Sequence, residues 1–98
     1  MGFQDDVLNM IKKIPYGKVT TYKIIGDKMG TSGYRAVGNA CKRNPNPIKI
    51  PCHRVVNSDG RVGGFKFGTK NKIKLLEKEG IKIKNGKIEN LEKILFKF

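Results

Sequence analysis

The chain is short of acidic residues and contains no long apolar run. Asp and Glu number 8 against 21 Lys and Arg, which gives a formal net charge of +13 and a pI of about 10.0. Such an excess indicates a polyanionic partner, most often nucleic acid. A lysine-rich thermophile surface is the alternative, although thermophiles enrich Glu together with Lys. No stretch approaches the roughly 20 apolar residues of a membrane helix, so we expect no contact with a membrane.

Cysteine and histidine are scarce as well, with two Cys and one His in 98 residues. These three residues cannot fill a four-ligand zinc site by themselves, and we expect neither a metal nor a cofactor. Cys41 and Cys52 could in principle form a disulfide. Residues 1–6 lack the basic region and apolar core of a secretory signal. We therefore expect a cytoplasmic, nucleoid-associated protein in which Cys52 is free.

The length suits one small domain, 1–98. Apolar residues recur at helical spacing, and Gly and Pro bound the segments. The pattern predicts helices over residues 3–14, 22–29, 34–43, 72–79 and 91–98. Hairpins are predicted around residues 57–60 and around Asn85-Gly86, and an extended chain is predicted after Pro45 and Pro47.

The second and third predicted helices are joined by the short turn Thr31-Ser32-Gly33. Two helices with such a turn are typical of a helix-turn-helix unit, whose second helix reads DNA. A hairpin behind this unit makes a winged helix. We therefore predict a mainly α (α+β) fold, a winged helix-turn-helix DNA-binding domain with small β-hairpins.

The most informative short segment is Pro51-Cys52-His53-Arg54-Val55. A thiolate is a strong nucleophile, and a nearby base makes it available near neutral pH. However, adjacent side chains on an extended strand point to opposite faces. A buried small cysteine beside a half-exposed histidine is the simpler interpretation of the dipeptide alone.

The blocks around this segment favour the catalytic interpretation. They are Gly17-Lys18-Val19-Thr20-Thr21-Tyr22, Arg35-Ala36-Val37-Gly38-Asn39-Ala40, Arg43-Asn44-Pro45, Pro47 to Val55, Gly63-Gly64 and Leu75 to Gly80. Their order resembles that of the O6-alkylguanine-DNA alkyltransferases (methylated-DNA–protein-cysteine methyltransferases) over residues 3–80. The segment 81–98 lies beyond the resemblance and is expected to complete the core. The family's usual N-terminal domain has no counterpart, so a fragment or a split domain is an open alternative.

The resemblance implies a chemical role for three residues. Cys52 would attack the alkyl carbon on guanine O6, and the stable thioether would consume the protein in one event. His53 would take the Cys52 proton through a water. Glu79 would orient the imidazole and stabilise its charged form. A solvated Glu79 in the last turn of a helix is the alternative for that residue.

The resemblance also implies supporting roles for three residues. Asn44 would form a hinge whose amide bridges backbone groups of the proline-rich loop. Tyr22 would rotate the target phosphate and stabilise the departing guanine; a core position is its alternative. Arg35 would enter the base stack when the nucleotide flips, which is necessary because O6 lies inside the duplex. A phosphate contact is the alternative for Arg35.

Two further sets are expected to contact the substrate. Ala36 and Gly38 are small and leave the surface of the third predicted helix without projecting side chains. This suits insertion into the minor groove or tight packing inside the domain. The pocket for alkylguanine would include Pro47, Val55, Gly64 and Phe65, where Phe65 replaces the family's usual tyrosine. Candidate phosphate contacts are Lys42, Arg43, Lys49, Arg54, Arg61 and Lys66.

We therefore expect a monomeric repair enzyme for double-stranded DNA containing O6-alkylguanine. The resemblance offers a second function, because short alkyltransferase-like proteins flip alkylguanine without repairing it and recruit excision repair. Those proteins have another residue in place of the cysteine, whereas this chain retains Cys52. A plain winged-helix regulator is a third hypothesis, but it gives no reason for the constellation of Cys52, His53 and Glu79.

Overall fold

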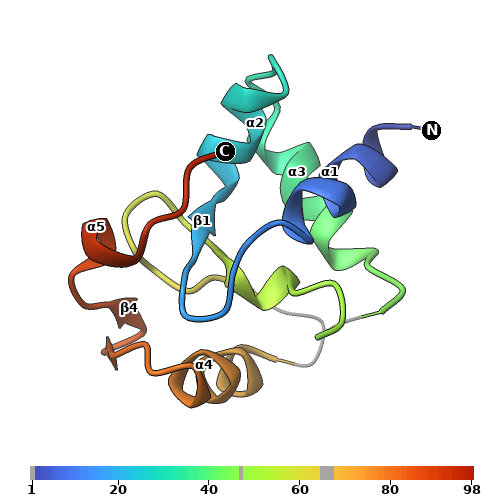
Figure 1. Cartoon of the computed structure of the whole chain (residues 1–98). Helices are drawn as coiled ribbons and strands as arrows, with labels where there is room; N and C mark the ends of the chain where they lie inside the picture. The colour runs from blue at the N-terminus through green and yellow to red at the C-terminus, as the bar shows by residue number, and fades with distance from the viewer. Residues whose placement is uncertain (1, 47, 65–67) are drawn as a thin grey trace.

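Five helices supply most of the regular structure in a computed structural model that describes residues 2–46, 48–64 and 68–98 (Figure 1). The mainly helical character with short strands agrees with the prediction. None of the described helices is long and apolar enough to cross a membrane. The helices are α1 (Phe3–Ile11), α2 (Tyr22–Lys28), α3 (Tyr34–Lys42), α4 (Thr69–Lys78) and α5 (Leu91–Ile94), with a 3₁₀ turn η1 (Cys52–Arg54).

The predicted helix-turn-helix is formed by α2 and α3, which pack against each other. The Thr21 side chain caps α2 by accepting a hydrogen bond from the Ile24 N–H at 3.0 Å. Gly30, at φ 74°, ends α2 in the left-handed region that favours glycine. The Thr31 hydroxyl accepts from the Gly33 N–H at 3.0 Å and shapes the turn before α3. Both helices are therefore fixed by local sequence.

The prediction of a hairpin around residues 57–60 is wrong. Strand β2 (Val55–Val56) pairs in parallel with β1 (Thr20–Thr21), so its partner lies far back in the chain. Residues 57–61 do form a turn, closed by a 2.9 Å bond from the Asn57 N–H to the Arg61 carbonyl. Both valines are fully buried. A strand covered on both faces belongs inside the molecule rather than on an exposed wing.

The short ladder of β1 and β2 lies between two hydrophobic clusters. Val55 faces the first cluster and Val56 the second, because successive strand side chains alternate. The first cluster joins α1, α2 and α3 to the Cys52 segment. The second joins α4 to the C-terminal segment. Its buried members are Val19, Val56, Val62, Leu76, Ile81 and Ile88.

The second predicted hairpin is confirmed, as β3 (Ile83–Lys84) pairs with β4 (Lys87–Ile88). Asn85 and Gly86 both have positive φ, 53° and 75°, as a type I′ turn requires. The helix expected over 91–98 is four residues long instead. The chain after α5 is extended, where the Phe96 N–H donates to the Val19 carbonyl at 2.6 Å. This pairing places the C-terminal segment beside Val19 and the start of β1.

Candidate active site

Cys52 and His53 lie in the 3₁₀ turn η1 and not in the extended chain that we expected. The Cys52 N–H donates to the Ile50 carbonyl at 2.7 Å, and the Arg54 N–H donates to the Pro51 carbonyl at 2.9 Å. The turn contacts α1 and α4. Only 5% of Cys52 and 2% of His53 is exposed. The simpler interpretation, in which the histidine is half-exposed, is therefore wrong.

Glu79, directly after α4, connects this turn to the rest of the protein. Its Oε2 lies 2.7 Å from His53 Nε2, and its Oε1 accepts from the Gly17 N–H at 2.8 Å. Arg54 Nε donates to both oxygens, at 2.9 and 3.1 Å. With 5% of its side chain exposed, Glu79 is not the solvated residue of the alternative.

The environment keeps Glu79 charged. Burial raises the pKa of its carboxyl, but the hydrogen bonds from Gly17, His53 and Arg54 outweigh burial and lower the pKa overall. A carboxylate can only accept hydrogen bonds. The neutral imidazole of His53 therefore carries its proton on Nε2 and its lone pair on Nδ1. Burial, opposed by Glu79, lowers the pKa of His53, so the ring is neutral near pH 7.

Arg54, which we predicted as a phosphate contact, makes several contacts within the protein. Its Nε binds Glu79, and its Nη1 donates to the Ile14 carbonyl at 2.8 Å. Its guanidinium also lies 5.6 Å from the centre of the Tyr16 ring, and only 15% of the side chain is exposed. Arg54 therefore holds Glu79 beside His53.

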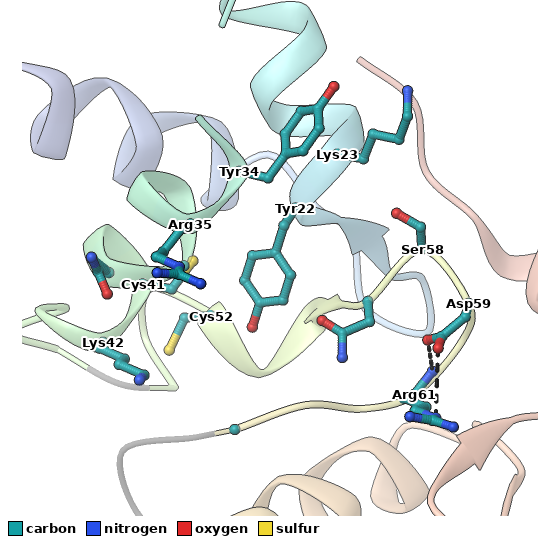
Figure 2. Close-up of a pocket in the computed structure, with 14 residues that line it drawn as sticks. Tyr22, Lys23, Tyr34, Arg35, Cys41, Lys42, Cys52, Ser58, Asp59 and Arg61 are labelled. Atoms are coloured by element: carbon teal, nitrogen blue, oxygen red, sulfur yellow. Dashed lines mark hydrogen bonds and ion pairs between the residues drawn. The ribbon is translucent and has the colours of Figure 1, made fainter. Parts of the chain in front are cut away.

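A cavity of about 640 Å³ opens beside Cys52 (Figure 2). Tyr22 points its hydroxyl toward the end of the cavity where Cys52 lies. Burial, followed by the nearby Cys41 and Cys52 thiols, raises the Tyr22 pKa, so this phenol stays protonated. Among the residues predicted for the site, those that line the cavity are Tyr22, Arg35, Gly38, Lys42, Cys52, Arg61 and Gly64.

Other predicted contacts lie elsewhere. The side chain of Val55 is fully buried in the first hydrophobic cluster, so it does not line the cavity. Ala36 and Arg43 line a smaller depression of about 240 Å³ beside α1. Pro47, Phe65 and Lys66 lie outside the described residues.

Asn44 is fully buried just after the end of α3. Its amide nitrogen donates to the Ile50 carbonyl at 2.7 Å, and its amide oxygen accepts from the Asn46 N–H at 2.9 Å. These two bonds close the loop that leads to Cys52. An asparagine supplies both the donor and the acceptor that such a loop requires.

Lys72 on α4 is fully buried as well. Its ammonium donates to the Val55 carbonyl at 2.7 Å and to the Gly64 carbonyl at 3.2 Å, and lies 5.8 Å from the Tyr22 ring centre. Burial lowers the Lys72 pKa to about 8, against the opposite effect of the Cys41 and Cys52 thiols. Lys72 thus joins the segment after Cys52 to the loop that lines the cavity.

Cys41 and Cys52 are both free. Both line the cavity, and burial together with Cys52 raises the Cys41 pKa to about 12. Cys41 is therefore a neutral thiol near pH 7. No group of three or more potential metal ligands occurs within 2–46, 48–64 and 68–98.

Comparison with known proteins decides the family. The sequence model described as "6-O-methylguanine DNA methyltransferase, DNA binding domain" matches residues 2–81. The chain belongs to this family. The methylated-DNA–protein-cysteine methyltransferase of Saccharolobus islandicus is 52% identical over 81 residues, which cover 83% of this chain and 52% of the relative. The chain thus spans about half the length of the curated relatives it matches.

Two solved structures of the family resemble this fold. Mycobacterium tuberculosis OGT in complex with DNA aligns with a TM-score of 0.78 and 40% identity, over 81% of this chain and 50% of the other. S. pombe Atl1, in complex with damaged DNA containing O6-carboxymethylguanine, aligns with a TM-score of 0.86 and 34% identity. That alignment covers 98% of this chain and 95% of Atl1. Residues 82–98, which the family model leaves out, are therefore included in the Atl1 alignment almost completely.

Analysis of the sequence did not identify Lys72 or Tyr34 as site residues of this family member. Lys72 lies four positions before the buried Leu76, and therefore on the inward face of α4. A lysine at an apolar position of a helix is the signal that could have revealed it. Tyr34 directly precedes Arg35 and lines the cavity. The sequence offers no comparable signal for Tyr34.

Proposed function

We propose that this protein repairs DNA by transferring an alkyl group from O6 of guanine to Cys52, irreversibly and without a cofactor. The observation that carries this proposal is the position of Cys52. It lines a cavity, while the next residue, His53, is bound by a buried glutamate. Nucleophile, base and orienting carboxylate are the parts that an activated cysteine needs.

The proposed reaction is a displacement at the alkyl carbon. The Cys52 sulfur forms a bond to this carbon, and the bond from the carbon to guanine O6 breaks. The thiol proton passes through a water to Nδ1 of His53, and Glu79 stabilises the resulting imidazolium. The hydroxyl of Tyr22 donates a hydrogen bond to the departing guanine. The guanine leaves as an anion and takes up one proton from water at N1, while the His53 imidazolium returns its proton to water. The products are therefore an S-alkylcysteine and neutral guanine, and each molecule reacts once.

Double-stranded DNA is the proposed substrate, and chromosomal DNA is the proposed place of action. The net charge of +13 favours binding to a polyanion. Arg35 is exposed on α3 and lines the cavity, where it would fill the space left by a flipped nucleotide. The DNA complexes of Mycobacterium tuberculosis OGT and S. pombe Atl1 support the same partner.

We further propose that residues 1–98 act as one domain and as a monomer. The alignment with nearly all of Atl1, whose structure contains damaged DNA, supports binding of a lesion by a chain of this size. Residues 81–98 contribute Ile81 and Ile88 to the second cluster, which supports a structural role for this segment.

The test is the intact mass of the protein after incubation with a duplex that carries one O6-methylguanine. A stoichiometric gain of about 14 Da, absent in Cys52→Ala, would establish transfer to this cysteine. Tighter binding to the lesion duplex without a mass gain would indicate a lesion sensor instead. Equal binding to damaged and undamaged DNA would contradict both functions.

A further inference from the structure

Tyr34, on the first turn of α3, lines the cavity and is held by contacts with α2. Its hydroxyl donates to Asp27 Oδ1 at 2.7 Å, and the Lys23 ammonium donates to Asp27 Oδ2 at 2.8 Å. The same ammonium lies 5.8 Å from the centre of the Tyr34 ring. Two residues of α2 thus fix both the end and the face of this aromatic ring.

The backbone of α2 fixes the ring as well. A Cβ built on Gly26 would lie 2.6 Å from Cδ1 and 2.8 Å from Cε1 of Tyr34, closer than real Cβ contacts. Only glycine therefore lets the ring lie against α2 in this way. The ring is only half-buried. A partly exposed aromatic face that is already held by its neighbours loses little conformational entropy when it binds a ligand.

The ring lies well away from Cys52. Figure 2 shows Tyr34 and Lys23 at the end of the cavity opposite Cys52, with Tyr22 between them. The Lys23 side chain is 56% exposed, so this end of the cavity is open to solvent. A base that reaches Cys52 stays joined to its deoxyribose and phosphates. The open end of the cavity offers space for those groups.

We propose that Tyr34, held by Asp27 and Lys23, binds the deoxyribose of the extruded nucleotide and so contributes to recognition of the lesion. This proposal rests on the proposed function only in requiring that the nucleotide enter the cavity. The ring face contacts the apolar edge of the sugar. Asp27 introduces little net repulsion toward the phosphates because Lys23 pairs with it.

The first experiment measures dissociation constants in the Cys52→Ala background, so that no transfer occurs. The probes are a fluorescent duplex with one O6-methylguanine and the same duplex with guanine. We expect Tyr34→Ala to weaken lesion binding about tenfold, the usual scale for removing an aromatic contact to nucleic acid. Binding to the undamaged duplex should change less than about twofold, because its sugars remain outside the cavity. Equal weakening for both duplexes, or none for either, would overturn the proposal.

Two conservative variants keep the test valid if Tyr34→Ala does not fold. Tyr34→Phe and Asp27→Asn retain the ring but loosen it, and each should weaken lesion binding less than Tyr34→Ala and leave undamaged binding unchanged. Asp6→Asn is the matched control, because Asp6 is exposed on α1 and lies outside the cavity. Unchanged lesion binding in both loosened variants would contradict a role for the fixed ring.

The second experiment uses free O6-benzylguanine, which has no sugar, with Cys52 intact. Tyr34→Ala should alkylate itself at the wild-type rate with the free base and more slowly with the same base in DNA. An equal slowing with both substrates would assign Tyr34 to the base pocket and overturn the proposal. If the wild type reacts with neither substrate, the proposed function fails, while the binding measurements still decide the role of Tyr34.

Discussion

Glu79 Oε2 lies 2.7 Å from His53 Nε2, although the two residues are 26 positions apart. The contact exists because α4 packs against the turn η1 and ends beside it. Arg54 and the Gly17 N–H bind the same carboxylate and fix its orientation. Under the proposed function, a Cys–His dipeptide becomes part of an activated nucleophile through this carboxylate.

Glu79→Gln should slow methyl transfer about 100-fold, at the lower end of the roughly 100- to 10,000-fold that general acid–base catalysis contributes. The amide keeps the shape of the side chain but removes the charge that stabilises the imidazolium. The measurement is the single-turnover rate on an O6-methylguanine duplex. Glu77→Gln, at an exposed position of α4 two residues earlier, is the control and should react as the wild type does. Equal rates for Glu79→Gln and the wild type would remove Glu79 from the mechanism.

The pKa of His53 can be measured directly, because the chain contains one histidine. Burial lowers this pKa, so NMR titration of the ring should give a midpoint below about 6.5, the ordinary value. The unfolded chain then binds the proton more readily. His53 therefore contributes stability that is complete above about pH 6.5 and is lost as pH falls toward the folded pKa.

The same titration in Glu79→Gln separates the two causes. The Glu79 carboxylate opposes burial and raises the pKa of His53. Its removal should lower the midpoint further. A midpoint above 6.5 in the wild type, or a rise in the variant, would contradict this account of the pair.

The helices could be predicted from sequence because their signals are local. Thr21, Gly30 and Gly33 lie at the ends of α2 and the start of α3, and each acts through residues next to it. The turn at Asn85-Gly86 is equally local. The pairing of Val55 with Thr20 joins positions 35 apart, and no neighbouring residue encodes it. A run of valines with a turn behind it therefore suggested a hairpin.

The residues of the candidate site likewise fall into those that the sequence indicated and those that only packing reveals. The resemblance to the family pointed to Cys52, His53 and Glu79, but geometry was needed to see that Arg54 binds Glu79 rather than facing solvent. The buried position of Lys72 depends on two carbonyls that belong to other segments. Long-range polar contacts of this kind follow from packing, and the spacing of apolar residues along the sequence does not predict them.

The C-terminal segment should be essential for stability. Ile88 is 7% exposed within the second cluster, so Ile88→Ala should lower the free energy of unfolding by about 2–4 kcal/mol. Removal of residues 81–98 should lower it further, because Ile81 and the pairing with Val19 are lost too. Lys84→Ala, exposed in β3, is the control. Thermal or chemical unfolding measures these changes, and an unchanged transition after truncation would refute the structural role.

Lys72 provides a test of the buried charge beside the cavity. Its pKa is about 8 in the folded protein and near 10.4 in an unfolded chain. Between these values the unfolded state binds more protons, so Lys72 should add stability as pH rises through this window. The full change is about 3 kcal/mol. The pKa values of Cys41 and Tyr22 are raised, so these two residues reduce the stability of the folded protein as pH rises over the same range.

Comparison with Lys72→Met isolates the contribution of Lys72, because Cys41 and Tyr22 are present in both proteins. The Lys72 charge lowers the Cys41 pKa, so the difference includes this coupling. The unfolding free energy of the wild type minus that of the variant should increase between pH 8 and about 10.4. Loss of the bonds to the Val55 and Gly64 carbonyls should also slow methyl transfer, since both segments border the site. Urea unfolding across this pH range measures the difference, and a flat or falling difference would mean that Lys72 keeps its ordinary pKa. A normal transfer rate in Lys72→Met would show that these two carbonyls need no ammonium to shape the cavity.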